Sequence, residues 1–484
     1  MKRLLSVLLL FLTFFLIFST AKSQNSAIKE NYLNNLIENY KKKETKPFSK
    51  GRYLIITPAE FESTLEYFAN YKRNIGFDVS IVNTNTTGKT SKAIKNFIQT
   101  QYKNISTRPT YVLLVGDVEY IPAYEGNSTA KVKSDPITDL GYALLSGNDY
   151  FADLNLGRFS LANVEQLKNI INKTIFMEVN LHLFGKNAIF IAGDEKKGVW
   201  NRTYMVNSFK NGHENVIKNS FIPLGYRCTE LYQPVLKSVV DAFNNNPLFF
   251  IYAGHGSITL FAGKSFEFGI REVHTAKNTV FPFVFSFACK TGNFSQNCVG
   301  EHFIRAKNKG AVAFWGCSVN SQTNTDKTIE KKIFGEAFTQ DERYLSQIIN
   351  LGMKRFATTA GPGKKTREIF LKAYNLLGDP AFDMKGVFAT TIHNDKITNP
   401  ALFSVFANPL NDSFSLVYTL EKETSVQIDM YSTSGEPLKN IMPISQQKPD
   451  CYYYKFSLTD LPSGQYELML KDSLRTLSTK IIKH

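Results

Sequence analysis

Two residues that each follow an apolar run could form a nucleophile and its base. Cys289 comes just after the run 281–287, and His255 follows the run 248–252 within Gly-His-Gly. A cysteine thiol with a pKa of about 8.5 is mostly protonated at neutral pH, so a neighbouring imidazole is needed to generate the thiolate. Reacting groups in open α/β sheets lie at the carboxyl ends of strands. The pattern therefore predicts a thiol nucleophile and a histidine base, provided that the two strands are neighbours.

The backbone near this pair suits a reaction at a carbonyl group. Gly254 and Gly256 flank His255, and glycine lets a substrate approach the chain closely. The backbone N–H groups of Gly256 and Cys289 could hold the oxyanion of a tetrahedral intermediate. Spacing alone leaves open that Cys289 is a small buried apolar residue and that His255 is a hydrogen-bonded structural residue. Ser257 is a weaker nucleophile candidate, because Gly-His-Gly-Ser lacks the Ser-centred elbow of hydrolases.

Short apolar strands alternate with helical patterns in two successive segments. In the first segment we expect strands at 52–57, 77–82 and 111–115, with a helical pattern after the first and a helix at 91–102. In the second we expect strands at 188–192, 248–252, 281–287 and 311–315, and a helix at 203–218. This alternation predicts an α/β fold whose mainly parallel sheets are covered on both faces. We place the two subdomains at 51–185 and 186–391, with the candidate residues in the second.

The last part of the chain has a different texture. Helical periodicity stops near residue 392, and alternating strands are expected at 414–420, 426–431, 452–458 and 466–470, separated by turn signals. The segment 392–484 is therefore predicted to be a small all-β sandwich.

The first residues read as an export signal. Lys2 and Arg3 precede an apolar run at 4–18, and small residues follow up to a cleavage point after Ser23. We expect a signal peptide at 1–23 and a short lead-in or pro-segment at 24–50. The alternative is a single membrane anchor, but the run is shorter than the ~20 residues that a span needs. No later stretch approaches that length, so no transmembrane segment is expected after cleavage.

Composition excludes several other classes of function. The formal net charge is +15, but the lysines are scattered and no nucleic-acid-binding motif accompanies them, so no nucleic-acid partner is expected. The five cysteines are Cys228, Cys289, Cys298, Cys317 and Cys451. So few in a long exported chain make no disulfide framework, and the absence of a CxxC pair argues against a structural zinc site. We therefore predict no metal ligands, and at least one free thiol.

Several stretches, in family order between residues 51 and 388, resemble the gingipain family of cysteine peptidases, whose fold is caspase-like. They are 53–61 (YLIITPAEF), 113–117 (LLVGD), 134–135 (SD), 146–150 with 156–160 (SGNDY and LGRFS), 252–257 (YAGHGS), 283–294 (FVFSFACKTGNF) and 377–380 (LGDP). The resemblance implies that His255 and Cys289 are the catalytic pair. The histidine precedes the cysteine, which is the opposite of the papain order.

The resemblance also implies a third catalytic residue. In the family an acidic residue follows a strand of the second subdomain, and the sequence Ile-Ala-Gly-Asp-Glu at 191–195 occupies that place. We expect Glu195 to orient His255 and favour its charged form, with Asp194 as the second choice. The alternative is that both are surface carboxylates at the end of a strand.

Specificity is read from two further positions. Arg-specific relatives carry an aspartate three residues before a His-Glu-Asn segment, which is 213–215 here, and the matching residue is Lys210. A lysine would repel an arginine side chain of the substrate, so strict Arg specificity is not expected. Alignment of the Lys-specific relative on 316–321 instead brings Asp326 onto its pocket aspartate. A buried carboxylate there would select a basic P1 residue, which favours Lys over Arg. The alternative is that Asp326 is solvated in a polar loop.

The C-terminal segment resembles the sorting domain recognised by the type IX secretion system. The matches are 408–409 (NP), 426–431 with Gly435, 461–466 (LPSGQY) and 478–482 (STKII). This implies the type IX machinery as a partner, passage across the outer membrane, and release or attachment at the cell surface. An ordinary immunoglobulin-like module is the alternative.

Together these features predict a secreted cysteine endopeptidase that acts on proteins or peptides and prefers a basic P1 residue. Two other functions stay open: a surface transpeptidase that processes sorting domains, and a degenerate peptidase that only binds at the surface. No cofactor is expected to be required. Calcium stabilises several relatives, so structural calcium stays open. The lead-in at 24–50 is much shorter than the family's inhibitory propeptide, and the separate immunoglobulin-like module that follows the catalytic unit in gingipains is not expected here.

Overall fold

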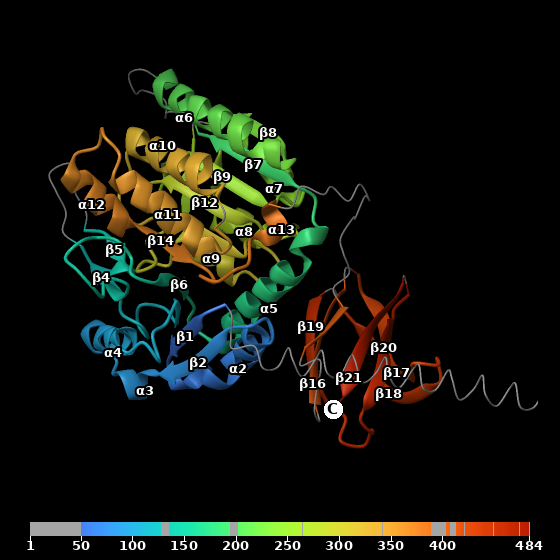
Figure 1. Ribbon diagram of the computed structural model, residues 1–484. Helices are drawn as coiled ribbons and strands as arrows, with labels where there is room; N and C mark the ends of the chain where they lie inside the picture. Colours follow the sequence, from blue (N-terminus) through green and yellow to red (C-terminus); the bar gives the residue numbers. More distant parts are fainter. Residues whose placement is uncertain are drawn as a thin grey trace, which may run out of the picture. The chain divides into compact units, whose positions relative to one another are not determined.

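The computed structural model describes residues 50–126, 135–193, 202–263, 265–340, 342–388, 403–406, 413–420, 422–448, 450–473 and 475–483 (Figure 1). The predicted signal peptide, almost all of the lead-in, and Asp194 and Glu195 lie outside these residues. Within them, none of the helices combines the length and the apolar character needed to span a bilayer.

The first part of the chain forms a parallel sheet with helices on both faces. Its strands are β1 (Arg52–Thr57), β2 (Asp78–Asn83), β3 (Tyr111–Val115) and β6 (Asn155–Phe159), in the order β6-β3-β1-β2. Helices α2 (Ala59–Asn74) and α5 (Val164–Asn180) pack on one face, and α4 (Ser91–Lys103) packs on the other. Short elements lie between them: α3 (Thr84–Thr87), β4 (Tyr124–Glu125) and β5 (Ile137–Thr138).

The second part continues the same sheet. Strands β7 (Asn187–Ala192), β8 (Arg227–Tyr232), β9 (Phe249–Gly256), β12 (Phe283–Ala288) and β13 (Ala313–Cys317) run parallel in the order β8-β7-β9-β12-β13. Strand β14 (Tyr374–Leu377) is antiparallel to β13 and joins β6 through the pair Leu377–Arg158. Strands β10 (Leu260–Ala262) and β11 (Glu267–Gly269) extend the sheet beside the end of β9. The predicted α/β fold with mainly parallel strands is confirmed, and both sets of strands belong to one 12-stranded sheet.

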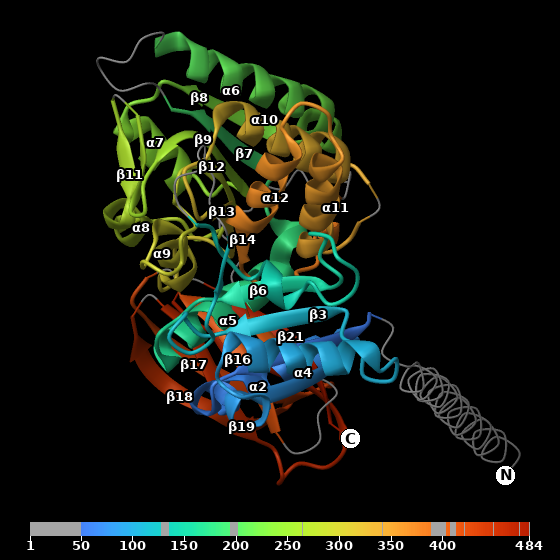
Figure 2. The same cartoon turned by 90° about the vertical axis from the view of Figure 1, so that its left-hand side faces the viewer.

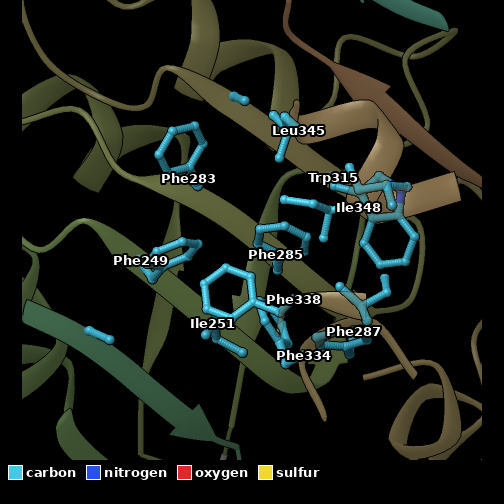
Figure 3. Packing of buried hydrophobic residues seen from close by; sticks show 14 of the residues in the cluster. Phe249, Ile251, Phe283, Phe285, Phe287, Trp315, Phe334, Phe338, Leu345 and Ile348 are labelled. Carbon is cyan, nitrogen blue, oxygen red and sulfur yellow. The ribbon is translucent and has the colours of Figure 1, made fainter. Parts of the chain in front are cut away.

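Helices cover both faces of this second part (Figure 2). One face carries α6 (Arg202–Val216), α10 (Thr323–Lys332), α11 (Leu345–Ala357) and α12 (Lys364–Ala373), and the short α13 (Lys385–Phe388) packs into the same core. The other carries α7 (Leu236–Asn244), α8 (Ile270–Thr275) and α9 (Val299–Arg305). Figure 3 shows the first core, where aromatic side chains of β9 and β12 meet those of the helices. The rings of Phe249 and Phe338 pack edge to face with centroids 5.5 Å apart, a favourable aromatic geometry.

The C-terminal segment forms two antiparallel sheets. One contains β15 (Phe403–Phe406), β16 (Ser413–Leu420) and β19 (Asp450–Ser457). The other contains β17 (Thr424–Ser432), β18 (Pro437–Gln447), β20 (Gly464–Lys471) and β21 (Thr476–Lys483). Alternate residues of both sheets, among them Leu416, Ile428 and Leu468, form one buried core. This arrangement is the predicted small all-β sandwich.

A buried charge cluster explains the Leu-Gly-Asp-Pro motif. The Nζ atom of Lys72 lies 2.7 Å from a carboxylate oxygen of Glu178 and 2.5 Å from one of Asp379, and all three side chains are almost wholly buried. The Tyr53 hydroxyl donates to the other Asp379 oxygen at 2.7 Å. Burial opposes the charged amine, but the two carboxylates raise the pKa of Lys72. The motif therefore joins β1 and α2 to the segment after β14.

Loss of the Lys72 amine should destabilise the fold far more than loss of a surface amine. We expect Lys72→Met to lower the free energy of unfolding by about 3–5 kcal/mol, because Glu178 and Asp379 then stay buried without a counter-charge. The control is Lys237→Met, which removes an exposed pair with Asp241 and should cost about 1 kcal/mol or less. Urea unfolding of both variants measures the difference. Equal losses would contradict this account.

Candidate active site

The register between β9 and β12 brings the two candidate residues together. These parallel strands pair Ala253 with Phe287 and Gly254 with Ala288. His255 is the next residue of β9, and Cys289 is the first residue after β12, so each directly follows one member of the last register pair. Neighbouring strands are about 4.8 Å apart, so an imidazole and a thiol on them can reach one another. Both residues are partly exposed, whereas the strands that carry them are buried.

A tight turn after β12 presents the cysteine. Lys290 has a φ of 59°, a left-handed conformation that is uncommon for a residue other than glycine, and its N–H donates to the Val319 carbonyl at 2.9 Å. The end of β9 approaches this turn so closely that a Cβ on Gly256 would lie 2.9 Å from the Cys289 carbonyl oxygen. Gly256 is therefore required for the close approach of the two strand ends. The proposed oxyanion donors, the N–H groups of Gly256 and Cys289, belong to this junction, and their role stays a prediction.

Ser321 contacts the sulfur atom directly, which the sequence did not indicate. Its backbone N–H donates to Cys289 Sγ at 3.2 Å, and its hydroxyl lies 3.7 Å from the same atom. Burial raises the pKa of the Cys289 thiol, and the hydrogen bonds from Ser321 oppose that rise only in part. The thiol therefore needs a base to become a nucleophile near neutral pH. Ser321 lies in the stretch 316–321 used to find Asp326, but nothing in its residue type marked it as a partner of the sulfur.

Asp326 lies behind Ser321 and not in a loop. It belongs to the first turn of α10, it is 1% exposed, and its Oδ1 accepts a hydrogen bond from the Tyr374 hydroxyl at 2.7 Å. Burial raises the pKa of Asp326 to about 7, although hydrogen bonds from Ser321 and Tyr374 favour the charged form. The alternative of a solvated loop carboxylate is wrong. The substrate-binding role of Asp326 stays a prediction.

The segment around Lys210 lies on helix α6. The Lys210 side chain is 43% exposed, and its Nζ lies 3.7 Å from Glu214. His213, in contrast, is buried, and its ring nitrogens lie 2.5 Å from Glu330 Oε1 and 3.2 Å from the Ile191 carbonyl oxygen. Burial disfavours the charged imidazole, but Glu330 raises the pKa of His213. The histidine of this segment therefore links α6 to α10 and β7 and has no direct part in the predicted chemistry.

The remaining predicted residue cannot be placed. Glu195 and its alternative Asp194 lie outside the described residues, and their roles stay predictions. The strand that leads to them, β7, lies next to β9, and the Gly193 N–H donates to the Ala253 carbonyl at 3.0 Å. Across the part of the chain that the structure describes, no three His, Cys, Asp or Glu side chains are grouped as a metal site would require.

A cavity of about 400 Å³ lies away from this pair. Tyr150, Trp315, Lys354 and Tyr374 are among the residues that line it, and neither His255 nor Cys289 is. Because neither residue of the candidate pair lines it, this cavity has no part in the predicted attack by the thiolate. The ends of β9 and β12 are therefore the better candidate for the site.

Comparisons with known proteins agree with this reading. The sequence profile of Peptidase family C25 matches residues 46–385. Gingipain R2 of Porphyromonas gingivalis strain W83 is 29% identical over 405 residues, which cover 78% of this chain and 52% of that protein. Gingipain R1 of the same species is 30% identical over 75% of this chain and 37% of its own length, and Lys-gingipain HG66 is 30% identical over 57% and 16%. The chain thus spans about half, or less, of the length of these relatives.

A solved structure supports the fold. The Arg-specific cysteine proteinase gingipain R (RGPB) superposes with a TM-score of 0.60 at 21% identity, over 90% of this chain and 98% of that one. A complex of the RgpB pro- and mature domains gives a TM-score of 0.61 at 22% identity, over 90% of this chain and all of that one. Because the C25 profile spans most of the residues that build the sheet and both strand ends, this chain belongs to peptidase family C25.

Proposed function

We propose that this chain is a cysteine endopeptidase. The observation that supports the proposal is the β9–β12 register, whose last pair, Gly254 with Ala288, directly precedes His255 and Cys289 at the carboxyl ends of two parallel strands. His255 takes the thiol proton, and the thiolate attacks the scissile carbonyl carbon. The N–H groups of Gly256 and Cys289 stabilise the resulting oxyanion. Glu195, or Asp194 in its place, orients the imidazole.

The intermediate then collapses into products. The C–N bond breaks, the imidazolium gives its proton to the leaving amine, and a thioester remains on Cys289. Water attacks the thioester after His255 removes one of its protons. The acyl C–S bond breaks, the carboxylic acid product leaves, and the imidazolium returns its proton to the Cys289 sulfur. Every role belongs to a group of the chain itself, and the proposal invokes no cofactor.

We further propose a preference for lysine at P1. Asp326 supports this, because its carboxyl accepts a hydrogen bond from the Ser321 side chain, and the Ser321 backbone N–H contacts the Cys289 sulfur. The ammonium group of a P1 lysine that reaches the Asp326 carboxylate would form a charge-assisted hydrogen bond shielded from bulk water. Relatives named for arginine and relatives named for lysine both match the chain, so their names do not decide between the two.

We also propose that the protein is exported and works outside the cell or at its surface. The basic and apolar N-terminal sequence supports Sec-dependent export, and the β-sandwich supports recognition by type IX machinery. A sorting domain carried on the same chain makes it a cargo of that system. This favours an endopeptidase over a transpeptidase that processes other sorting domains.

Replacement of the nucleophile should abolish hydrolysis. We expect Cys289→Ala to lower kcat/KM for fluorogenic peptides at least about 1000-fold, because no other group can form the thioester. The matched control is Cys228→Ala. Cys228 is also only partly buried, its pKa is raised to about 12 by burial, and its loss should change little. Hydrolysis unchanged in Cys289→Ala would refute the mechanism, and an inactive wild type whose Cys289 resists iodoacetamide would favour the degenerate binding protein.

The proposed P1 preference should depend on pH. The Asp326 carboxyl is mainly neutral below pH 7 and charged above it, because burial raises its pKa to about 7. We therefore expect the ratio of kcat/KM for a Lys peptide to that for the matching Gln peptide to rise up to about tenfold from pH 6 to pH 8. The ratio cancels every effect of pH on the reaction that the two substrates share. In Asp326→Asn the ratio should be low and flat, and a wild-type ratio that stays constant would refute the role of Asp326.

A further inference from the structure

The hydroxyl of Tyr252 lies at the backbone of the candidate histidine. It is 2.6 Å from the His255 carbonyl oxygen and 2.9 Å from the Ala262 carbonyl oxygen. His255 and Ala262 face each other across the antiparallel pairing of β9 and β10. One phenol proton is thus shared by two backbone acceptors on neighbouring strands, at the point where β9 leaves β7 and joins β10.

Two glycines lie against the Tyr252 hydroxyl. A Cβ on Gly193 would lie 2.7 Å from the Tyr252 oxygen, and a Cβ on Gly254 would lie 2.6 Å from it. Gly254 also has a φ of 157°, which disfavours other residues. Gly254 in β9 and Gly193 after β7 therefore leave room for the hydroxyl. A phenylalanine at position 252 would not need this space.

The ring of Tyr252 is held as firmly as its hydroxyl. The side chain is 0% exposed, and it packs against Phe261, with centroids 4.5 Å apart, and against Phe266. Tyr252 and His255 have opposite parity on the strand, so the ring lies on the face opposite to the imidazole. The ring is thus held rigidly in the core on one face of the sheet. Its hydroxyl contacts the backbone of His255, whose side chain lies on the other face.

We propose that Tyr252 is a positioning residue for the catalytic histidine: its hydroxyl fixes the His255 backbone and so keeps the imidazole directed at Cys289. This rests on the proposed function. Without the hydroxyl each of the two carbonyl groups loses one donor, and the β9–β10 junction shifts. The shift moves the imidazole relative to the sulfur, and a displacement of about 1 Å can cost about 100-fold in rate.

Tyr252→Phe tests the proposal because it keeps the ring and removes only the hydroxyl. We expect kcat for a fluorogenic peptide to fall about 10- to 100-fold with KM within about twofold, because substrate contacts remain while the base moves. The rate of Cys289 alkylation by iodoacetamide at pH 6, followed by mass spectrometry, should fall in parallel, because it reports the thiolate that His255 maintains. The pH profile of that rate should shift toward the titration of an unassisted thiol.

The matched control is Tyr142→Phe. The Tyr142 ring is also 0% exposed, and its hydroxyl donates to the Pro122 carbonyl, outside the strands of the sheet. It should match Tyr252→Phe in melting temperature but keep wild-type kcat and alkylation. If both variants lose activity in proportion to stability, or if Tyr252→Phe stays within twofold of wild type with an unchanged profile, the positioning role is wrong.

A second variant covers the case in which Tyr252→Phe does not fold. Gly193→Ala keeps the hydroxyl but puts a methyl group 2.7 Å from it, so the hydroxyl must move, and we expect the same loss of kcat and alkylation rate. Normal values in Gly193→Ala would overturn the proposal. Failure of the proposed function is a separate result: the wild-type protein would then show neither hydrolysis nor preferential alkylation of Cys289 over Cys228.

Discussion

The register between strands β9 and β12 is the constraint on which the candidate site depends. A slip of one residue would turn every side chain of one strand to the opposite face, and Gly254 and Ala288, which precede His255 and Cys289, would no longer pair. Phenylalanine packing fixes that register, since Phe249, Phe283 and Phe285 interlock with the helices of one core. The aromatic core therefore has a chemical consequence beyond stability: it sets where two strands end relative to each other.

The same burial that fixes the strands makes the thiol harder to ionise. Cys289 follows a fully buried strand, and burial raises the pKa of its thiol. The Ser321 N–H and the cationic side chain of Lys290 favour the thiolate, whereas Asp326 disfavours it. Because burial outweighs the groups that favour the thiolate, the decisive contribution falls to an imidazole. The position of His255 then matters more than it would beside an exposed and easily ionised cysteine.

Much of the architecture could be predicted because the spacing of apolar residues along the chain indicates which side chains are buried. The predicted strand at 111–115 agrees with β3 to the residue, and the α/β pattern followed from short apolar runs. Strands with mixed burial were missed: β8, an edge strand, and β18 have no clean apolar run.

The candidate pair was found because glycines and strand ends mark it. Ser321 was not, because it acts on the sulfur through its backbone N–H, which no residue type reveals. The hydrogen bonds of the Tyr252 hydroxyl were also not predicted, because an aromatic residue in an apolar run is normally assigned to the core.

Buried charges explain why the first half of the sheet accompanies a pair that lies entirely in the second. Strands β6 and β14 share only one register pair, so backbone pairing alone gives a weak junction. Ion pairs strengthen it: Lys72 meets Asp379 in the interior, and Arg305 meets the partly exposed Asp117 at 2.9 Å. Apolar surfaces tolerate small shifts, but a buried charge that loses its partner is costly, so these pairs select one alignment of the two halves. The family-like motifs that contain Asp117 and Asp379 are therefore best understood as contacts that align the two halves of the sheet.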